Sequence, residues 1–165
     1  MTKTVYLSLG SNLGDRAANL RQGLARLSEL GTITARSSLY ETEPVELGDA
    51  QPWFLNCAVA METELRPEEF LQRILAIEQA MGRRRTGIKS SRNIDIDIIF
   101  FGDAVIASDH LTVPHPAMQQ RGFVLEPLAE IAPDVMHPVL KRSVRELRDE
   151  LPETSATVRK LISPA

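Results

Sequence analysis

The stretch that most constrains the fold of this chain is Ile94-Asp95-Ile96-Asp97-Ile98-Ile99-Phe100-Phe101. Apolar and acidic residues alternate from Ile94 to Ile98, and this period of two predicts a β-strand with one buried face. The alternation predicts one face with Ile94, Ile96, Ile98 and Phe100, and an opposite face with Asp95, Asp97, Ile99 and Phe101. We therefore expect a strand that carries two carboxylates on one side.

These two carboxylates have two interpretations. Asp95 and Asp97 lie two residues apart, so their Cα atoms are separated by about 6.6 Å and their side chains lean toward the same space. Neighbouring carboxylates repel each other, and without a cation at least one would hold its proton. Mg²⁺ suits carboxylate oxygens and removes the repulsion. The pair is therefore a candidate magnesium site, and a solvent-facing strand edge is the alternative.

A cationic segment precedes this strand. Residues 83–92 contain five basic side chains and no acidic one, although the formal net charge of the whole chain is −3. Arginine presents forked N–H donors that match phosphate oxygens, so this segment would suit a polyphosphate that chelates Mg²⁺ beside the aspartates. A solvated charged loop is the alternative. The basic residues are Arg83, Arg84, Arg85, Lys89 and Arg92.

The first half of the chain predicts two helices among strands. A strand over 4–9 leads into a glycine-rich turn, where Asp15 or Ser11 can cap a helix that ends at Gly31. The turn lacks the sequence of a phosphate-binding P-loop, and we interpret it as mainly structural. Further strands are expected over 33–43 and 54–62, and a second helix from Pro67 to Gly82.

Shorter elements are expected after the acidic strand. Gly102-Asp103 predicts a hairpin turn into a short strand through Val105 and Ile106. Helices are expected over 118–130, with a break or kink at Pro127, and over 143–151, followed by a loose tail. The whole order predicts an α+β fold, namely a ferredoxin-like βαββαβ sandwich with a mostly antiparallel sheet, an added hairpin and C-terminal helices.

Composition excludes several classes of protein. The chain of 165 residues is expected to form a single domain over 1–165. Its net charge of −3 and aromatic content of 5% argue against nucleic-acid binding, and no apolar run approaches the ~20 residues of a membrane span. The single cysteine, Cys57, is typical of a reducing compartment. We expect a cytoplasmic protein that is a monomer, because no large apolar stripe is left over for an interface.

Two further polar residues are candidates for a site. Asn56 is a lone amide on the strand face that also carries Phe54, so it either bridges backbone groups or contacts a ligand. His115 stands between two prolines, which hold it in an extended segment close in sequence to Arg121 and Phe123. A lone histidine is usually inert, but one held in this way could donate to a phosphate. The three histidines lack the spacing of a zinc site.

Together these stretches resemble the motifs of the 6-hydroxymethyl-7,8-dihydropterin pyrophosphokinases, which are enzymes of folate biosynthesis. The resemblance extends from Val5 to about Pro138 and is specific because the motifs occur in order. The motifs are Gly10-Ser11-Asn12-Leu13-Gly14, Tyr40-Glu41-Thr42-Glu43-Pro44, Phe54-Leu55-Asn56, Gly82-Arg83 with Arg85, Arg92-Asn93-Ile94-Asp95-Ile96-Asp97-Ile98, Val113-Pro114-His115, and Arg121-Gly122-Phe123.

The resemblance implies that ATP gives its β,γ-diphosphate to the hydroxymethyl group of the pterin and leaves as AMP. It implies that Asp95 and Asp97 hold two Mg²⁺ ions. It also implies a secondary role for Asp97, which could take the proton of the attacking hydroxyl. The implied catalytic residues are Arg83, Arg85, Arg92, Asp95 and Asp97. The implied ATP contacts are Leu71, Glu78, Arg83, Arg92, Ile98, Thr112, His115 and Arg121. The implied pterin contacts are Thr42, Pro44, Val45, Phe54, Asn56 and Phe123, with the flat ring stacked between the two phenylalanines.

The sequence departs from the family pattern at one place. Many relatives carry a tryptophan and then Gly-Pro before the arginine that opens the acidic strand, whereas this chain has Lys89-Ser90-Ser91. The aromatic lid is therefore absent from its expected position. Trp53 is the only tryptophan, and strand parity directs it away from the Phe54 face, so we predict that it does not replace the lid.

Two other functions fit the same fold. One is a different ATP-dependent phosphotransferase that moves a single phosphoryl group and releases ADP. The other is a non-catalytic ferredoxin-like binding module, which for RNA would need exposed aromatic residues on a basic sheet.

Overall fold

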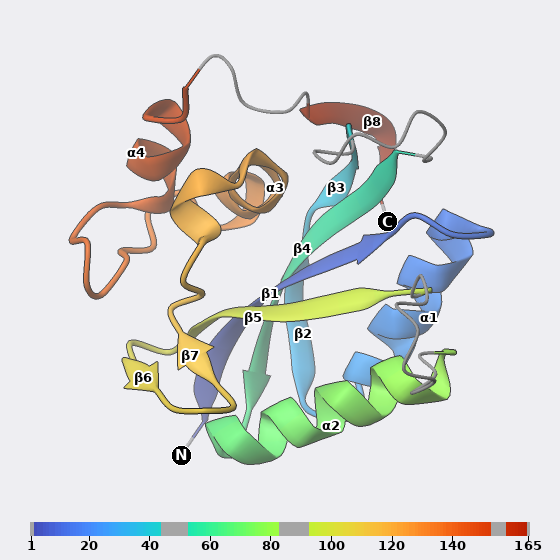
Figure 1. The fold of residues 1–165 in the computed structure, drawn as a ribbon, viewed down its shortest axis with the longest axis horizontal. Helices are drawn as coiled ribbons and strands as arrows, with labels where there is room; N and C mark the ends of the chain where they lie inside the picture. The colour runs from blue at the N-terminus through green and yellow to red at the C-terminus, as the bar shows by residue number, and fades with distance from the viewer. Residues whose placement is uncertain (1, 44–52, 83–92, 153–157, 165) are drawn as a thin grey trace.

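The computed structural model describes residues 2–43, 53–82, 93–152 and 158–164. Its main sheet is antiparallel, with strand order β5-β1-β4-β3-β8, and β2 also pairs with β4 (Figure 1). The elements are β1 (Lys3–Ser11), α1 (Arg16–Leu27), β2 (Thr32–Arg36), β3 (Ser38–Thr42), β4 (Phe54–Thr63), α2 (Pro67–Ala80), β5 (Asp95–Phe101), β6 (Ile106–Ala107), β7 (Thr112–Val113), a 3₁₀ turn (Met118–Gln120), α3 (Gly122–Ile131), α4 (Val144–Asp149) and β8 (Val158–Pro164).

The predicted ferredoxin-like fold is confirmed. When β2 and β3 are taken as one interrupted strand, the elements up to β5 follow the order βαββαβ. The single strand expected over 33–43 is wrong at Ser37, whose hydroxyl accepts a hydrogen bond from the Ala58 N–H at 2.8 Å and donates to the Ser38 carbonyl at 2.7 Å. The side chain thereby replaces a backbone acceptor of the ladder, and the strand is divided.

Helices cover both faces of the sheet (Figure 1). One apolar cluster joins α1 and α2 to the face that carries Leu7, Leu55 and Ile96. A second cluster joins α3 and α4 to the opposite face, through Ala58 and Phe100. The C-terminal helices therefore bury the sheet face that a minimal ferredoxin-like domain leaves open.

A β-bulge in β5 changes the predicted alternation. Tyr6 pairs with Phe100 but Leu7 pairs with Ile98, so Ile99 is an extra residue on β5. Ile99 and Phe100 both pack in the cluster under α3, and Phe101 packs in the cluster under α2. The expected faces of Phe100 and Phe101 are therefore exchanged, because the bulge shifts the period of two by one residue. The predicted faces of residues 94–98 are unaffected.

The C-terminal third differs from expectation in three places. The short strand after Gly102 pairs with β7 and not with β5, so the hairpin is β6–β7. The helical stretch from Met118 is broken at Arg121, and Pro127 lies inside α3 without ending it. The expected loose tail contains β8, which pairs with β3. Short mixed segments such as 158–164 carry no clear period, so their pairing depends on the strand beside them.

Two helix starts follow the predicted chemistry. The Asp15 carboxylate caps α1 by accepting from the Ala18 N–H at 3.0 Å, and Pro67 is the first residue of α2. Ser143 and Glu146 form a capping box at the start of α4. None of the helices in the described ranges is long and apolar enough to cross a membrane.

Glu130 ties the end of α3 to β3. Its carboxylate accepts hydrogen bonds from the Tyr40 hydroxyl at 2.6 Å and from the Ser38 N–H at 3.1 Å. Burial raises the pKa of Glu130, but the hydrogen bonds from Tyr40 and Ser38 outweigh burial and hold that pKa below its usual 4.5. A depressed pKa in the folded state means that this stabilisation is present above the ordinary pKa and is lost as the pH falls through the folded value.

We expect Glu130→Gln to lower the free energy of unfolding near neutral pH by about 1–3 kcal/mol, the usual cost of weakening hydrogen bonds to a charged group. The difference from the unchanged protein should shrink below about pH 4.5, because protonation then removes the same charge. Urea unfolding over a pH series measures both effects. Glu126→Gln is the matched control on the same helix, since the Glu126 carboxylate lies 3.8 Å from Arg148 in an exposed pair. An equal loss in both variants would contradict the expectation.

Candidate active site

The two aspartates lie on the sheet face that α3 covers. In the register of the sheet, Gly10 stands between Asn56 of β4 and Asp95 of β5. Two residues along β1, Ser8 stands between Ala58 and Asp97. Directly paired residues share a face, so the amide and the two carboxylates face the same side. The structure thus brings together two predicted groups that are about 40 residues apart in the chain.

Gly10 lies between the Asn56 amide and the Asp95 carboxylate and has no side chain to fill the space between them. A Cβ atom at this position would lie 2.7 Å from the Asn56 Nδ2 atom and 3.7 Å from the Phe54 ring. The absence of a side chain therefore gives the Asn56 amide its place on the sheet. Sequence reasoning assigned Gly10 to a structural turn and missed this role, because the signal lies in the pairing of β1 with β4.

The structure gives Asn56 a side-chain partner. The Thr42 hydroxyl donates to the Asn56 Oδ1 atom at 2.7 Å, and both residues are buried. Within the described ranges, the partner of the Asn56 amide is therefore a side chain and not a pair of backbone groups. Thr42 pairs directly with Phe54, so Thr42, Phe54 and Asn56 form one patch at the end of β3 and β4.

His115 is attached to the bulge of β5. Its N–H donates to the Ile99 carbonyl at 3.0 Å, and its Nδ1 atom accepts from the Ala117 N–H at 3.2 Å. An accepting Nδ1 leaves the proton of the neutral ring on Nε2. Burial lowers the pKa of His115, the Asp97 carboxylate opposes this shift, and Arg121 adds to it.

Arg121 and Phe123 flank the first residue of α3. Arg121 is the N-cap residue, and its guanidinium carbon lies 5.6 Å from the centre of the Phe123 ring. Phe123 packs against the cluster under α3, on the same side of the sheet as Phe54 and Asn56. The break at Arg121 thus places both side chains at the start of a helix, whereas the sequence predicted a helix from Met118 with its break or kink at Pro127.

Three predicted ATP contacts, Leu71, Glu78 and Ile98, lie on the sheet face opposite the two aspartates. Ile98 is buried, and Leu71 packs against the same cluster on the α2 side. Glu78 is 4% exposed and accepts a hydrogen bond from the Ile96 N–H at 2.9 Å. β5 ends the sheet, so Glu78 satisfies a backbone donor of an edge strand midway between Asp95 and Asp97. Thr112 is exposed on β7.

Several predicted residues lie outside the described ranges. They are Pro44 and Val45 of the pterin set, Arg83, Arg85 and Arg92 of the catalytic set, and Lys89-Ser90-Ser91 at the position of the family's aromatic lid. Trp53 lies within a described range, and its ring faces the Arg159 guanidinium at 5.1 Å. This contact agrees with the predicted direction of Trp53, away from the Phe54 side.

The donor set of the aspartate face fits a magnesium ion that is shared with a phosphate. Within the described ranges, no group of three or more His, Cys, Asp or Glu side chains is arranged to hold a metal. Asp95 and Asp97 are partly exposed and supply two carboxylates. Mg²⁺ commonly binds through one or two carboxylates and fills its remaining positions with water and substrate phosphates.

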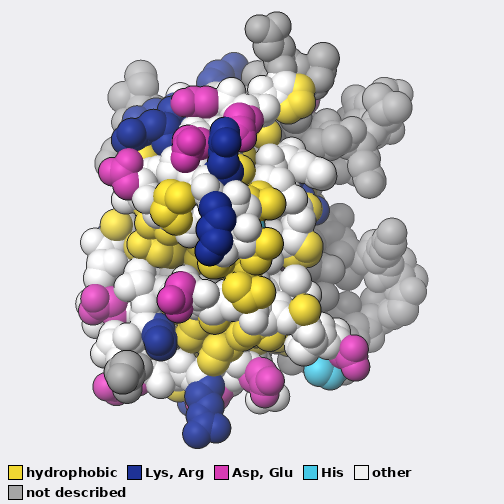
Figure 2. Space-filling model, turned by 90° about the vertical axis from the view of Figure 1, so that its left-hand side faces the viewer, with side chains coloured by type: hydrophobic (Ala, Val, Ile, Leu, Met, Phe, Trp, Pro, Cys, Tyr) yellow, Lys and Arg dark blue, Asp and Glu magenta, His cyan; other side chains and the backbone are white. Residues whose placement is uncertain are grey.

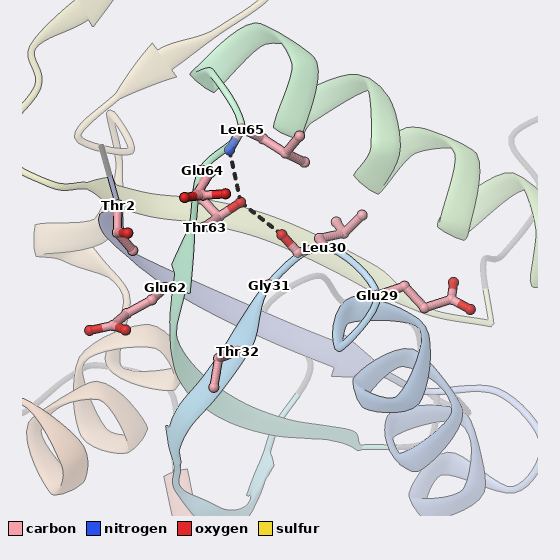
Figure 3. A pocket seen from close by; sticks show the side chains of 9 residues that line it. All are labelled: Thr2, Glu29, Leu30, Gly31, Thr32, Glu62, Thr63, Glu64 and Leu65. Atoms are coloured by element: carbon pink, nitrogen blue, oxygen red, sulfur yellow. Dashed lines mark hydrogen bonds between the residues drawn. The ribbon is translucent and has the colours of Figure 1, made fainter.

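A pocket of about 430 Å³ lies at the opposite end of β1 (Figure 3). Its lining includes Glu29, Glu62 and Glu64, and the Thr63 hydroxyl donates to the Leu30 carbonyl at 2.8 Å. Lys3 pairs with Thr63 here, whereas Gly10 pairs with Asp95 at the other end of the same strand. This lining contains three acidic side chains and no basic one, so it does not favour a free phosphate anion.

Comparison with known proteins identifies the family. The sequence profile of the 7,8-dihydro-6-hydroxymethylpterin-pyrophosphokinase (HPPK) family matches residues 6–133. The chain belongs to this family. The HPPK relatives include the 2-amino-4-hydroxy-6-hydroxymethyldihydropteridine pyrophosphokinase of Aquifex aeolicus, 38% identical over 89% of this chain and 91% of that protein. The Bacillus subtilis protein of the same name is 45% identical over 82% of this chain and 81% of that protein.

Longer proteins share the same region. The folic acid synthesis protein fol1 of Schizosaccharomyces pombe is 42% identical over 91% of this chain, which spans 21% of that protein. This chain thus spans about a fifth of the length of the first relatives that it matches. Among solved structures, the wild-type HPPK-DHPS of Plasmodium falciparum with pteroate has a TM-score of 0.72 and 22% identity, and the match covers 91% of this chain and 42% of that one. At that identity the likeness shows the fold.

Proposed function

We propose that this protein transfers diphosphate from ATP to the hydroxymethyl group of 6-hydroxymethyl-7,8-dihydropterin and releases AMP. The observation that carries the proposal is the row Asn56–Gly10–Asp95, which sets an amide and a carboxylate on one face with only a glycine between them. Such a row suits a flat polar ring at one end and a metal-bound phosphate at the other. Membership of the HPPK family supports a hydroxymethyldihydropterin as the acceptor substrate.

Asp95 and Asp97 are the residues that would hold Mg²⁺, and two ions are proposed. When bound, the metal neutralises phosphate charge and lowers the pKa of a coordinated hydroxyl. Mg²⁺ is consistent with a site that offers two protein carboxylates and leaves other positions to phosphate oxygens. Asp97 could also accept the proton of the attacking hydroxyl, as a secondary role.

The other residues of the chain bind and orient the two substrates. Phe54 and Phe123 offer aromatic surfaces for the pterin, and Asn56, held by Thr42, offers its amide to the polar edge of the ring. Burial lowers the pKa of His115 and so favours the neutral ring, whose Nε2–H can donate to a phosphate oxygen because Nδ1 accepts from the Ala117 N–H. Arg121 adds a cation beside it. The roles of Pro44, Val45, Leu71, Glu78, Arg83, Arg85, Arg92, Ile98 and Thr112 are proposed on the family resemblance.

Incubation of the protein with ATP, Mg²⁺ and 6-hydroxymethyl-7,8-dihydropterin tests the proposal. We expect one AMP for each pterin diphosphate formed, measured by chromatography. Omission of the pterin is the control, since it separates transfer from simple ATP hydrolysis. Release of ADP with a singly phosphorylated product would instead support another phosphotransferase on the same fold. Binding of both ligands without any turnover would support a non-catalytic module.

We further propose that residues 1–165 act as one domain and that the protein is a cytoplasmic monomer. The buried free thiol of Cys57 supports a reducing compartment, because an internal disulfide needs a second cysteine. The face with α4 and the β6–β7 hairpin mixes acidic, basic and apolar side chains (Figure 2). A mixture of charges of this kind is typical of a surface in contact with water.

A further inference from the structure

Four residues from different parts of the chain meet behind the proposed pterin patch. They are Arg16 at the start of α1, Glu41 of β3, Trp53 before β4 and Arg159 of β8, and we call them the rear cluster. The Arg16 Nη1 atom donates to the Trp53 carbonyl at 2.7 Å and lies 3.2 Å from the Glu41 Oε2 atom. The Arg159 Nη2 atom donates to the Glu41 Oε1 atom at 2.9 Å, and the Arg159 guanidinium faces the Trp53 ring.

The rear cluster and the pterin patch occupy opposite faces of the same strand ends. Glu41 pairs directly with Leu55, which packs in the cluster under α1 and α2. Thr42 pairs with Phe54, and its hydroxyl reaches Asn56 on the face under α3. Because successive residues on a strand point to opposite faces, a contact behind Glu41 fixes the position of Thr42 in front.

Arg16 holds the two strands together through one nitrogen. It binds the main chain before β4 and the side chain of β3, and its side chain is 30% exposed. Because the hydrogen bond is to the Trp53 carbonyl, it restrains the main chain before β4 whatever rotamer the Trp53 side chain adopts. Arg159 differs, because its side chain is 62% exposed and the contacts of its guanidinium within the cluster are with the Glu41 carboxylate and the Trp53 ring. Exposed ion pairs contribute little, so Arg16 is the stronger member.

The Glu41 carboxylate remains charged between the two arginines. The hydrogen bond from Arg159 lowers the pKa of Glu41, burial opposes this, and Arg16 lowers the pKa further. The lowered pKa favours the charged form of Glu41 and with it the ion pairs to both arginines. Asp95 and Asp97 lie on the other face of the sheet, and β1 and β4 stand between their strand β5 and the strand β3 that carries Glu41.

We propose that Arg16 is a positioning residue for the pterin, acting through the Trp53 carbonyl and Glu41 to hold Thr42, Phe54 and Asn56 in place. This inference rests on the proposed function, since it deepens the account of the same site. Arg16 makes no contact with the substrate. Its loss should weaken binding of the pterin and leave binding of ATP unchanged, because the ATP-binding residues belong to other elements.

The test measures the dissociation constant of the pterin and, separately, the KM for ATP and kcat. We expect Arg16→Ala to weaken pterin binding about tenfold, within the hundredfold that a misplacement of ~1 Å can cost. The KM for ATP and kcat at saturating pterin should stay within about twofold, as expected for a change in substrate binding alone. Arg16→Lys should restore most of the affinity, because a single nitrogen makes both contacts and an ammonium group has three donors.

Two further variants make the result specific. Glu41→Gln keeps the shape of the side chain and removes one arm of the cluster, so it should weaken pterin binding about threefold, in the range of a part-exposed ion pair. If Arg16→Ala does not fold, Glu41→Gln tests the same positioning role in its place. Asp134→Asn is the matched control, since it breaks the exposed pair of Asp134 with Arg145, at 3.2 Å, outside the rear cluster. That variant should bind the pterin as the unchanged protein does.

The outcomes separate this inference from the proposed function. If the unchanged protein releases AMP and both Arg16→Ala and Glu41→Gln bind the pterin normally, the positioning role is wrong and the proposed function stands. If the losses appear equally in pterin binding, ATP binding and kcat, Arg16 has a general structural role and the inference is also wrong. If the unchanged protein neither binds the pterin nor releases AMP, the proposed function itself fails.

Discussion

Asp97→Asn is expected to lower diphosphate transfer by about a thousandfold or more, the upper part of the range for removing a group that stabilises charge in a transition state. The change keeps the size of the side chain and removes the charge that would hold Mg²⁺ against the phosphates. Pterin binding should change little, because Asn56 and Thr42 lie on β4 and β3 and Asp97 lies on β5. AMP formation measures the first effect, and calorimetric titration with the pterin measures the second.

The control for this substitution is Asp103→Asn. Asp103 is exposed and lies just after the end of β5, so the change removes the same charge from the same region. Transfer by this variant should equal that of the unchanged protein within about twofold, since isolated surface changes rarely matter. An Asp97→Asn protein that retains more than about a tenth of the activity would contradict the role of Asp97 as a metal ligand.

Gly10→Ala is expected to weaken pterin binding about a hundredfold, the scale of a displacement of ~1 Å in a binding site. The added methyl group would lie 2.7 Å from the Asn56 Nδ2 atom, which is closer than van der Waals contact permits. Asn56 cannot move away freely, because the Thr42 hydroxyl holds its Oδ1 atom at 2.7 Å. The free energy of unfolding should also fall by about 1–3 kcal/mol, the usual cost of overpacking.

Gly14→Ala distinguishes this crowding from the loss of glycine as such. Gly14 has a φ of +58° and no atom within 4 Å of the position where a Cβ would lie. Its substitution should cost about 1–2 kcal/mol of stability through backbone strain and leave pterin affinity nearly unchanged. Fluorescence titration with the pterin and urea unfolding measure the two effects. Normal pterin affinity in a folded Gly10→Ala protein would show that pterin binding does not require a glycine at position 10.

Much of the fold could be predicted because its strongest signals are local. The alternation from Ile94 to Ile98 places Asp95 and Asp97 on one face, and the structure agrees. Pro67 and Asp15 mark helix starts by chemistry that depends on the nearest turn. The exchanged faces of Phe100 and Phe101 were not predictable in this way, because the bulge arises from the register between β5 and β1.

The sequence predicted which types of residue form the candidate site, but not the contacts that hold them in place. Asn56 was recognised as an unusual amide, but its partner Thr42 belongs to another strand. His115 is attached to the carbonyl of Ile99, the extra residue of the same bulge, and this contact joins segments 16 residues apart. β8 was missed entirely, because a short segment without a period becomes a strand only when a free edge such as that of β3 is available.

The sequence by itself determined the order of the elements, the face of the two carboxylates and, through its motifs, the family. Each of these depends on residues that are close in the chain or on an ordered set of short patterns. The tertiary structure alone decided that Gly10 separates Asn56 from Asp95, and that Arg16 contacts both the Trp53 carbonyl and the Glu41 carboxylate. Those relations depend on the register between distant strands, which is set by packing of the whole sheet and not by any single segment.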